Sequence, residues 1–349
     1  VLIQIPGARI ENPSYSTTGH IVYSREGSNA GIYAVPFSLE KLALAGEPFL
    51  VEADGSLPSQ SRDGMLIYVQ GASHVLNQMV WVDRSGKVLE KAGQEQREIT
   101  NPVVSPDGRK VAVSADENNN RDVWIQDLVR GSRSRLTFDP ALAFPLPWSA
   151  AGDRVFFVEG LGGVSTIKSK AADGTGEAST HTKGDFASLS PDGKSLAFMM
   201  RDPKTKEDLW MMSLEGDGKP VVLLQTPARE RIPAISPDGH YVAYISDESG
   251  REEIYLTRFP DGGGKWQVSV DGGNAPVWVK KTGELLFRNG DLIMIVPVAT
   301  QPSLTLGQPR ELFNANASRL LVIPGKKFDS DPAGSRILAI QGVGESTIE

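Results

Sequence analysis

Ser105-Pro106-Asp107-Gly108 is the stretch that decides the fold, because the same four residues return at Ser190–Gly193 and at Ser236–Gly239. Serine first, proline second and glycine fourth are the preferences of a type I turn between antiparallel strands. Looser versions of the turn precede five other glycines, so eight marks follow at intervals of 41 to 51 residues: Gly19, Gly64, Gly108, Gly152, Gly193, Gly239, Gly283 and Gly334. This period predicts a repeat architecture.

Each turn is followed by an alternating apolar strand, such as Val111-Ala112-Val113, and about ten residues later by a second strand, such as Val123-Trp124-Ile125. A third segment closes the unit, and one more strand leads into each turn. Four antiparallel strands in about 44 residues, without helical periodicity, are typical of a β-propeller blade. Trp81, Trp124 and Trp210 are expected at one repeat position, and Trp148 and Trp278 at another.

The blade count follows from the turns. Eight units of about 44 residues account for the 349-residue chain. The last repeat stops soon after Gly334, and a surplus strand, Val1–Ile5, precedes the first. We therefore expect one all-β domain over residues 1–349, an eight-bladed propeller in which the amino-terminal strand completes the last blade and protects its edge. Seven blades are the alternative, if the final repeat is only a cap.

Composition excludes several classes of protein. The 36 basic and 43 acidic side chains give a net charge of −7, which disfavours nucleic acid as a partner. No apolar run approaches the roughly 18 residues of a membrane span, so we expect no membrane insertion of this segment. The chain has no cysteine, which excludes disulfides and thiolate chemistry. We expect a monomer.

The repeats resemble TolB-like, WD-repeat-like propellers, in which Ser-Pro-Asp-Gly is followed by an apolar strand and then by Asp-Val-Trp-like segments. Three segments are more closely similar to the carboxy-terminal propeller of bacterial eukaryotic-like Ser/Thr protein kinases: residues 80–86, 122–128 and 236–273. The resemblance implies a sensor domain, outside the cytoplasm, of a receptor-type kinase. The chain itself contains no kinase motif and no Gly-x-Ser-x-Gly nucleophile motif, so neither phosphoryl transfer nor peptidase activity is expected.

Metal chemistry has weak support in the sequence. The four histidines form no His-x-His or His-Glu-x-x-His pair. Oxygen-bearing residues alternate at Asp116, Asn118, Asn120 and Asp122, as in a calcium loop, but Arg121 stands where that loop requires glycine. We expect no cofactor, with calcium in this loop or in the channel as the alternative. Asp122, Asp208 and Glu253 recur at one repeat position, which indicates a shared structural hydrogen bond.

Candidate binding residues are those at the entrance of each innermost strand, because these entrances converge on one mouth of the channel. Unlike the framework positions, they differ between repeats: Asn12, Asp54, Asn101, Phe144, Asp185, Arg231, Asn274 and Lys327. This mixture fits a non-catalytic module that binds a protein segment or a small polar ligand. The alternative is a lactonase-like hydrolase or lyase, with a divalent cation held by Asp54, Asn101, Asp185 and Asn274.

Overall fold

The Ser-Pro-Asp-Gly stretches form the predicted turns between antiparallel strands. In the first of them, the Gly108 amide donates to the Ser105 carbonyl at 2.9 Å, and the Ser105 hydroxyl donates to Asp107 at 2.6 Å. Gly108 has a φ of 72°, a conformation that side chains disfavour. The turns at Gly193 and Gly239 repeat these contacts. The motif therefore favours a hairpin turn through contacts among its own residues.

A computed structural model describes residues 8–27, 31–53, 55–70, 76–117, 120–160, 165–216, 218–321 and 328–343. All regular secondary structure in these ranges is β-strand, which confirms the all-β prediction. The described residues contain no helix that is long and apolar enough to span a membrane.

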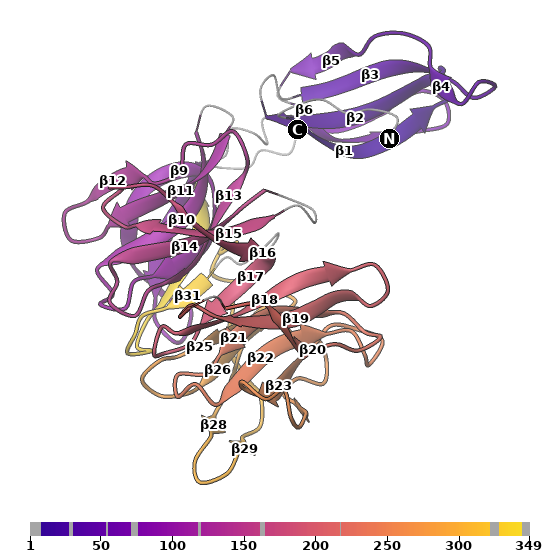
Figure 1. The fold of residues 1–349 in the computed structure, drawn as a ribbon. Coiled ribbons are helices and arrows are strands. Elements are labelled where there is room, and N and C mark those ends of the chain that lie inside the picture. The colour runs from indigo at the N-terminus through magenta and orange to yellow at the C-terminus, as the bar shows by residue number, and fades with distance from the viewer. Residues whose placement is uncertain are drawn as a thin grey trace.

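Four sheets have four antiparallel strands each, as a propeller blade requires (Figure 1). The first two are β13 (Ala143–Trp148), β14 (Arg154–Glu159), β15 (Thr166–Ala171) and β16 (Ser179–Lys183), and β17 (Asp185–Leu189), β18 (Ser195–Asp202), β19 (Lys206–Ser213) and β20 (Val221–Leu224). The next two are β21 (Glu230–Ile235), β22 (Tyr241–Ser246), β23 (Glu253–Arg258) and β24 (Trp266–Gln267), and β25 (Asn274–Trp278), β26 (Leu285–Asn289), β27 (Leu292–Val296) and β30 (Arg310–Asn314). A small ribbon, β28 (Val298–Ala299) with β29 (Thr305–Leu306), projects from the last sheet.

A seven-stranded sheet contains two more four-stranded units that share one long strand, β9 (Val88–Val104). The second part of β9 pairs with β10 (Lys110–Glu117), followed by β11 (Asn120–Asp127) and β12 (Ser132–Arg135). The first part pairs with β8 (Leu76–Val82), which in turn pairs with the carboxy-terminal hairpin of β31 (Phe328–Ser330) and β32 (Ile337–Val343). The end of the chain is thus joined to its first third.

This pairing corrects the predicted completion of the last sheet. The free edge of β32 is taken by β8, with Ala339 opposite Val80 and Leu338 opposite Trp81, and not by the amino-terminal strand. Residues 1–5, which we expected in that place, lie outside the described residues. The physical reason is that β8 and β9 together supply two paired strands to the edge of β32.

The second repeat is consequently divided between two places. Its first two strands, β6 (Gly55–Gln60) and β7 (Leu66–Gln70), form a two-stranded sheet, while its last two strands are β8 and the start of β9. The β6–β7 hairpin packs on a sheet built from the first repeat: β1 (Ala8–Ser16), β2 (His20–Gly27), β3 (Gly31–Ser38), β4 (Ala43–Leu44) and β5 (Phe49–Ala53). Figure 1 shows β1–β6, in indigo, apart from the strands labelled β9 and onward.

The six four-stranded units from β8 to β32 contact one another in a cyclic order. Their first strands touch in sequence, β9 to β13, β17, β21, β25 and β31, and β31 touches β9 again. A hydrophobic cluster lies between each pair of consecutive units, and one cluster joins Leu338 and Ile340 of the last unit to Ile99 and Val113 of the first. The count of eight blades is not confirmed, and the single-domain assignment stays a prediction.

The tryptophans confirm one predicted repeat position and correct another. Trp148 and Trp278 donate to the carbonyls of Val103 and Ala234 in the preceding sheet, at 2.9 and 2.8 Å. Trp81, however, faces the sheet that follows it and packs in one cluster with Trp124, which faces the sheet that precedes it. A shift of one residue along a strand reverses every side chain. Trp81 therefore does not share the position of Trp124 and Trp210.

An ion pair tests whether the junction of β32 with β8 stabilises the fold. Arg84, which follows β8, donates to both Glu284 oxygens at 2.8 and 3.0 Å and to the Gly334 carbonyl at 3.3 Å. Hydrogen bonding to Arg84 lowers the pKa of Glu284. Its stabilisation is therefore present above the ordinary glutamate pKa and is lost as the pH falls through the lowered pKa.

We expect a double-mutant cycle of Arg84→Ala and Glu284→Gln, measured by urea unfolding, to give a coupling of about 1 kcal/mol at pH 7 and none at pH 3. The control is Lys91→Ala with Glu95→Gln, an exposed ion pair within one strand, for which no coupling is expected. Equal coupling in both cycles would contradict the assignment.

Candidate functional site

The inner strands β9, β17, β21 and β25 each contain a bulge beside the predicted entrance residue. The register shifts between Asp185 and Ser188, between Arg231 and Ala234, and between Asn274 and Val277. Residues in the left-handed region mark these bulges, with φ angles of 45 to 52°: Asn101, Phe186, Ile232 and Ala275. Bulges re-aim side chains and are common beside functional sites. Here they fix the direction of the entrance side chains.

Five of the eight predicted entrance residues lie on inner strands of neighbouring sheets. They are half-buried and lie on consecutive inner strands β9, β13, β17, β21 and β25: Asn101, Phe144, Asp185, Arg231 and Asn274. Asn12 is exposed on β1, outside the cyclic arrangement. Asp54 and Lys327 lie outside the described residues.

Arg231 and Asn274 meet on one carboxylate that the sequence analysis missed. Glu252, in the loop before β23, forms an ion pair with Arg231 and accepts a hydrogen bond from Asn274 Nδ2 at 2.6 Å. Arg231 and Glu252 keep 26% and 40% of their side chains exposed, so water and ligands can reach the pair. The contact joins two neighbouring sheets at the entrance.

Two other entrance residues, Phe144 and Asp185, lie beside charged side chains. Arg121 forms an ion pair with Glu98, and its guanidinium lies 5.9 Å from the centre of the Phe144 ring. Burial raises the pKa of Asp185, and this effect exceeds the opposing influence of Ser165 and Arg201. Beside Asp185, the Phe186 ring is 41% exposed. The entrance thus offers both charges and aromatic surface.

Glu230, next to Arg231, is a buried carboxyl in an acidic environment. Its residue is 1% exposed, Thr226 donates a hydrogen bond to one oxygen, and the other oxygen has no partner among the described residues. Burial, together with the charges of Asp208 and Glu248, raises the pKa of Glu230 to about 7. A buried carboxyl with one unpaired oxygen is most stable in its neutral form. Glu230 therefore titrates near neutral pH.

The recurring acids Asp122, Asp208 and Glu253 have the structural role that the repeat predicts. Asp122 accepts from Thr137 and Arg135 at 2.8 and 2.6 Å, and Asp208 accepts from Thr205 at 2.7 Å. All three acids are fully buried. Asp122 and Glu253 link their own strands to the segment that closes the same sheet, and Asp208 does so through Gln225 at 3.0 Å.

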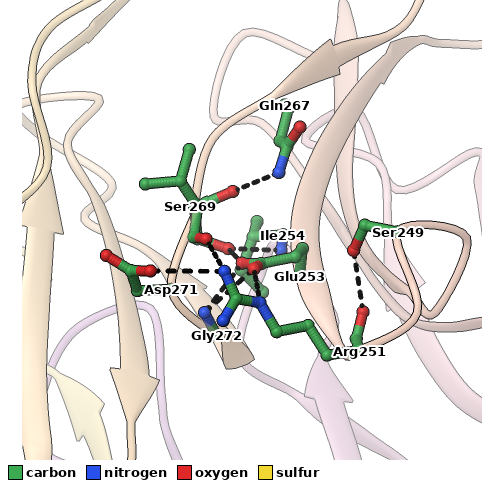
Figure 2. Close-up of polar contacts among 9 residues, drawn as sticks. Ser249, Arg251, Glu253, Ile254, Gln267, Ser269, Asp271 and Gly272 are labelled. Carbon is green, nitrogen blue, oxygen red and sulfur yellow. Dashed lines mark hydrogen bonds and ion pairs between the residues drawn. The ribbon is translucent and has the colours of Figure 1, made fainter.

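Figure 2 shows the version of this network around Glu253. The carboxylate accepts from Arg251 Nε at 2.8 Å, from the Gly272 amide and from the Ser269 hydroxyl, while Asp271 lies on the other side of the guanidinium. Ser269 also accepts from the Ile254 amide at 2.8 Å. A cavity of about 340 Å³ lies beside this network, and its walls are Ser249, Gly250, Arg251, Glu253, Gln267 and Val270.

Nothing in the described residues forms a ready metal site. No group of three or more His, Asp or Glu side chains there is placed to hold a metal ion. Both oxygens of Asp122 accept hydrogen bonds, including one from Asn120 at 2.9 Å, and Asn118 lies outside the described residues. The calcium loop of Asp116, Asn118, Asn120 and Asp122 stays a prediction.

One sequence signal could have located the entrance better. A proline follows the bulge residue in several inner strands, as in Asn101-Pro102, Ile232-Pro233 and Ala275-Pro276. Proline removes a ladder donor and is therefore tolerated at a bulge. Aligned on this proline, Asn101 matches Ile232 and Ala275, whereas Arg231 and Asn274 lie one residue earlier. Glu252 and Glu98 carried no signal, because their ion pairs join segments distant in sequence.

The comparisons with known proteins agree with the sheet architecture. The sequence model of the TolB beta propeller domain matches residues 56–282. A putative TolB from Agrobacterium tumefaciens is similar in structure, with a TM-score of 0.59, 17% identity and coverage of 78% of this chain and 99% of that one. TolB from Acinetobacter baumannii has a TM-score of 0.50, 17% identity and coverages of 84% and 82%. An oligogalacturonate lyase from Vibrio parahaemolyticus has a TM-score of 0.49, 14% identity and coverages of 84% and 79%. No curated protein matches the sequence.

Glu230 gives the site a testable pH dependence. Between its ordinary pKa of 4.5 and its folded pKa of about 7, the unfolded chain releases a proton that the folded chain retains. The folded state therefore loses stability as the pH rises through this window, by about 3 kcal/mol when complete. We expect the free energy of unfolding in urea to be similar for Glu230→Gln and the native protein at pH 5. At pH 8 we expect it to be higher for Glu230→Gln. Glu215→Gln, at an exposed position, is the control; parallel pH profiles for native protein and Glu230→Gln would refute the assignment.

Proposed function

Because this chain belongs to the TolB beta propeller domain family, we propose that it is a non-catalytic binding module whose channel mouth engages a protein segment or a small polar ligand. The observation that carries the proposal is the half-exposed contact of Arg231, Glu252 and Asn274 between two sheets. An ion pair in contact with water contributes little to stability, so its partners can be exchanged for those of a ligand.

The mouth differs from the framework in a way that favours binding. Asp122, Asp208 and Glu253 are fully buried and serve their own sheets. Asp185, Arg231 and Asn274 are half-buried, and each sheet presents a different side chain at this place. An exposed Phe186 ring beside Asp185 adds an aromatic surface. Charges of both signs beside aromatic rings suit a peptide that carries charged and apolar residues.

The proposal includes a blade count. The six four-stranded units of residues 76–343 are the blades of one propeller, and the hairpin of β31 and β32 with β8 and β9 is the blade that closes it. The cyclic contacts of the inner strands support this count. The channel mouth is then framed by six inner strands, on which the entrance residues lie.

The wider setting is also a proposal. The segments that resemble the propeller of bacterial receptor-type kinases support a sensor role outside the cytoplasm, with the mouth as the sensing surface. The alternative, a hydrolase or lyase with a divalent cation in the channel, has no specific support among the described residues. Metal analysis of the protein dialysed against calcium or zinc separates the two functions. The enzyme requires about one bound metal ion per chain, whereas the binding module requires none.

The binding proposal is tested with peptides selected on the native protein from a displayed random library. We expect Asp185→Ala with Arg231→Ala to weaken the binding of the selected peptides about tenfold or more, measured by calorimetry, because two charged hydrogen-bonding groups are lost. The matched control is Glu215→Ala with Lys194→Ala, which removes one acid and one base from an exposed pair beside the turns at the opposite end. Equal affinity for both double variants would refute the site.

A further inference from the structure

Among the described residues, strand β7 has one unpaired edge and one uncovered face. In the described residues it pairs only with β6, whereas the corresponding strand of every four-stranded sheet has a neighbour on both sides. Leu66 and Tyr68 pack against the first repeat, but Ile67 and Val69 on the other face are 65% and 47% exposed. An exposed, uncharged strand edge is normally covered or blocked.

The chain contains a second strand of the same pattern, which is paired. Leu66-Ile67-Tyr68-Val69-Gln70-Gly71 matches Ile337-Leu338-Ala339-Ile340-Gln341-Gly342 at every position in residue class apart from Tyr68 and Ala339. In β32, Leu338 and Ile340 are fully buried against the next sheet. Ile67 and Val69 are their equivalents on β7. The two strands thus present the same side chains to a partner.

That partner is β8. In the repeat, β8 follows β7 directly, with only residues 71–75 between them, a length usual for a hairpin connection. In the structure β8 instead pairs with β32, which lies more than 250 residues away in sequence. One edge of β8 is occupied by β9, so only one other strand can pair with it at a time.

We propose that the β6–β7 and β31–β32 hairpins are alternative partners for the same edge of β8, so that this chain can close its sheets in two ways. In the structure described here, the carboxy-terminal hairpin holds the edge. In the other arrangement β7 pairs with β8, and residues 8–70 join the propeller as additional blades.

The exchange has defined consequences for neighbouring contacts. When β31 and β32 leave, Arg336 loses its ion pair with Glu90, and Asp329 loses the hydrogen bond from the Val104 amide, at 2.6 and 2.8 Å. Trp81 loses the Arg336 guanidinium, 4.4 Å from its ring centre. These losses are offset by burial of Ile67 and Val69 and by a much shorter connection between the paired strands. Additional blades would also widen the channel at whose mouth the entrance residues lie.

The absence of cysteine allows a direct competition experiment in the full chain. Gln341 is paired with Gln78 in the structure, and Gln70 is the equivalent of Gln341 on β7. In the triple variant Gln70→Cys, Gln78→Cys, Gln341→Cys, the cysteine at position 78 can bond to either competitor. We expect peptide mapping after equilibration in a glutathione buffer to find both linkages, 70–78 and 78–341. Directly opposed antiparallel positions satisfy disulfide geometry.

The ratio of the two disulfides distinguishes an exchange of β8 between the two hairpins from random encounters of the cysteines. Adding Leu338→Asp should shift the ratio at least tenfold toward 70–78, and adding the equivalent Ile67→Asp at least tenfold toward 78–341. Replacing Gln70→Cys by Val69→Cys moves the thiol to the opposite face of β7 and should abolish the linkage to position 78. Linkage 78–341 alone, even with Leu338→Asp, or equal linkage by positions 69 and 70, would overturn the proposal.

Hydrogen exchange of the unmodified chain provides a second test that needs no substitution at Gln78. Two alternative pairings predict two isotope populations for peptides over residues 66–70 and 337–343, with Leu338→Asp increasing the protected population of 66–70. A single population in both peptides, unchanged by Leu338→Asp in a variant that keeps its β-sheet circular dichroism, would contradict the exchange.

Discussion

The pairing of β32 with β8 is the contact on which the rest of the structure depends. It joins segments more than 250 residues apart, and closing so long a loop costs about 3 to 4 kcal/mol more than closing a five-residue hairpin. Packing on both faces of β32 offsets this cost. Leu338 and Ile340 lie against β10 and β11, and Ile337 and Ala339 lie against the sheet of β25–β27. Without this junction, the apolar faces of the two sheets on either side of β32 would be exposed to water.

The bonds that the sheets share explain why the variable residues lie at the starts of the inner strands. Every sheet needs the same internal bonds, so the buried acids Asp122, Asp208 and Glu253 occur in nearly the same network in three sheets. The starts of the inner strands are half-buried, so packing constrains their side chains less than it constrains the buried acids. Asp185, Arg231 and Asn274 therefore differ from sheet to sheet, as residues that recognise a ligand often do.

Much of the fold was predictable because its information is local. The Ser-Pro-Asp-Gly turns, the alternating strands after them and the four-stranded sheets follow from rules that span fewer than 50 residues. The entrance was predictable in part, since Asp185, Arg231 and Asn274 lie where the repeat places them. Glu252 and Glu230 were not, because their importance comes from partners on other strands: the Arg231 guanidinium in one case, and Asp208 and Glu248 in the other.

The sequence by itself determined that this protein is built from antiparallel strands in repeated hairpins, because turn residues and period-two alternation act between near neighbours. It could not determine which hairpin closes the arrangement. Leu66–Gln70 and Ile337–Gln341 have almost the same pattern, so the sequence does not distinguish them as partners of β8. Only the tertiary structure decided between them, through contacts such as Arg84 with Glu284 and Arg336 with Trp81, because such contacts form only when segments distant in sequence are already packed together.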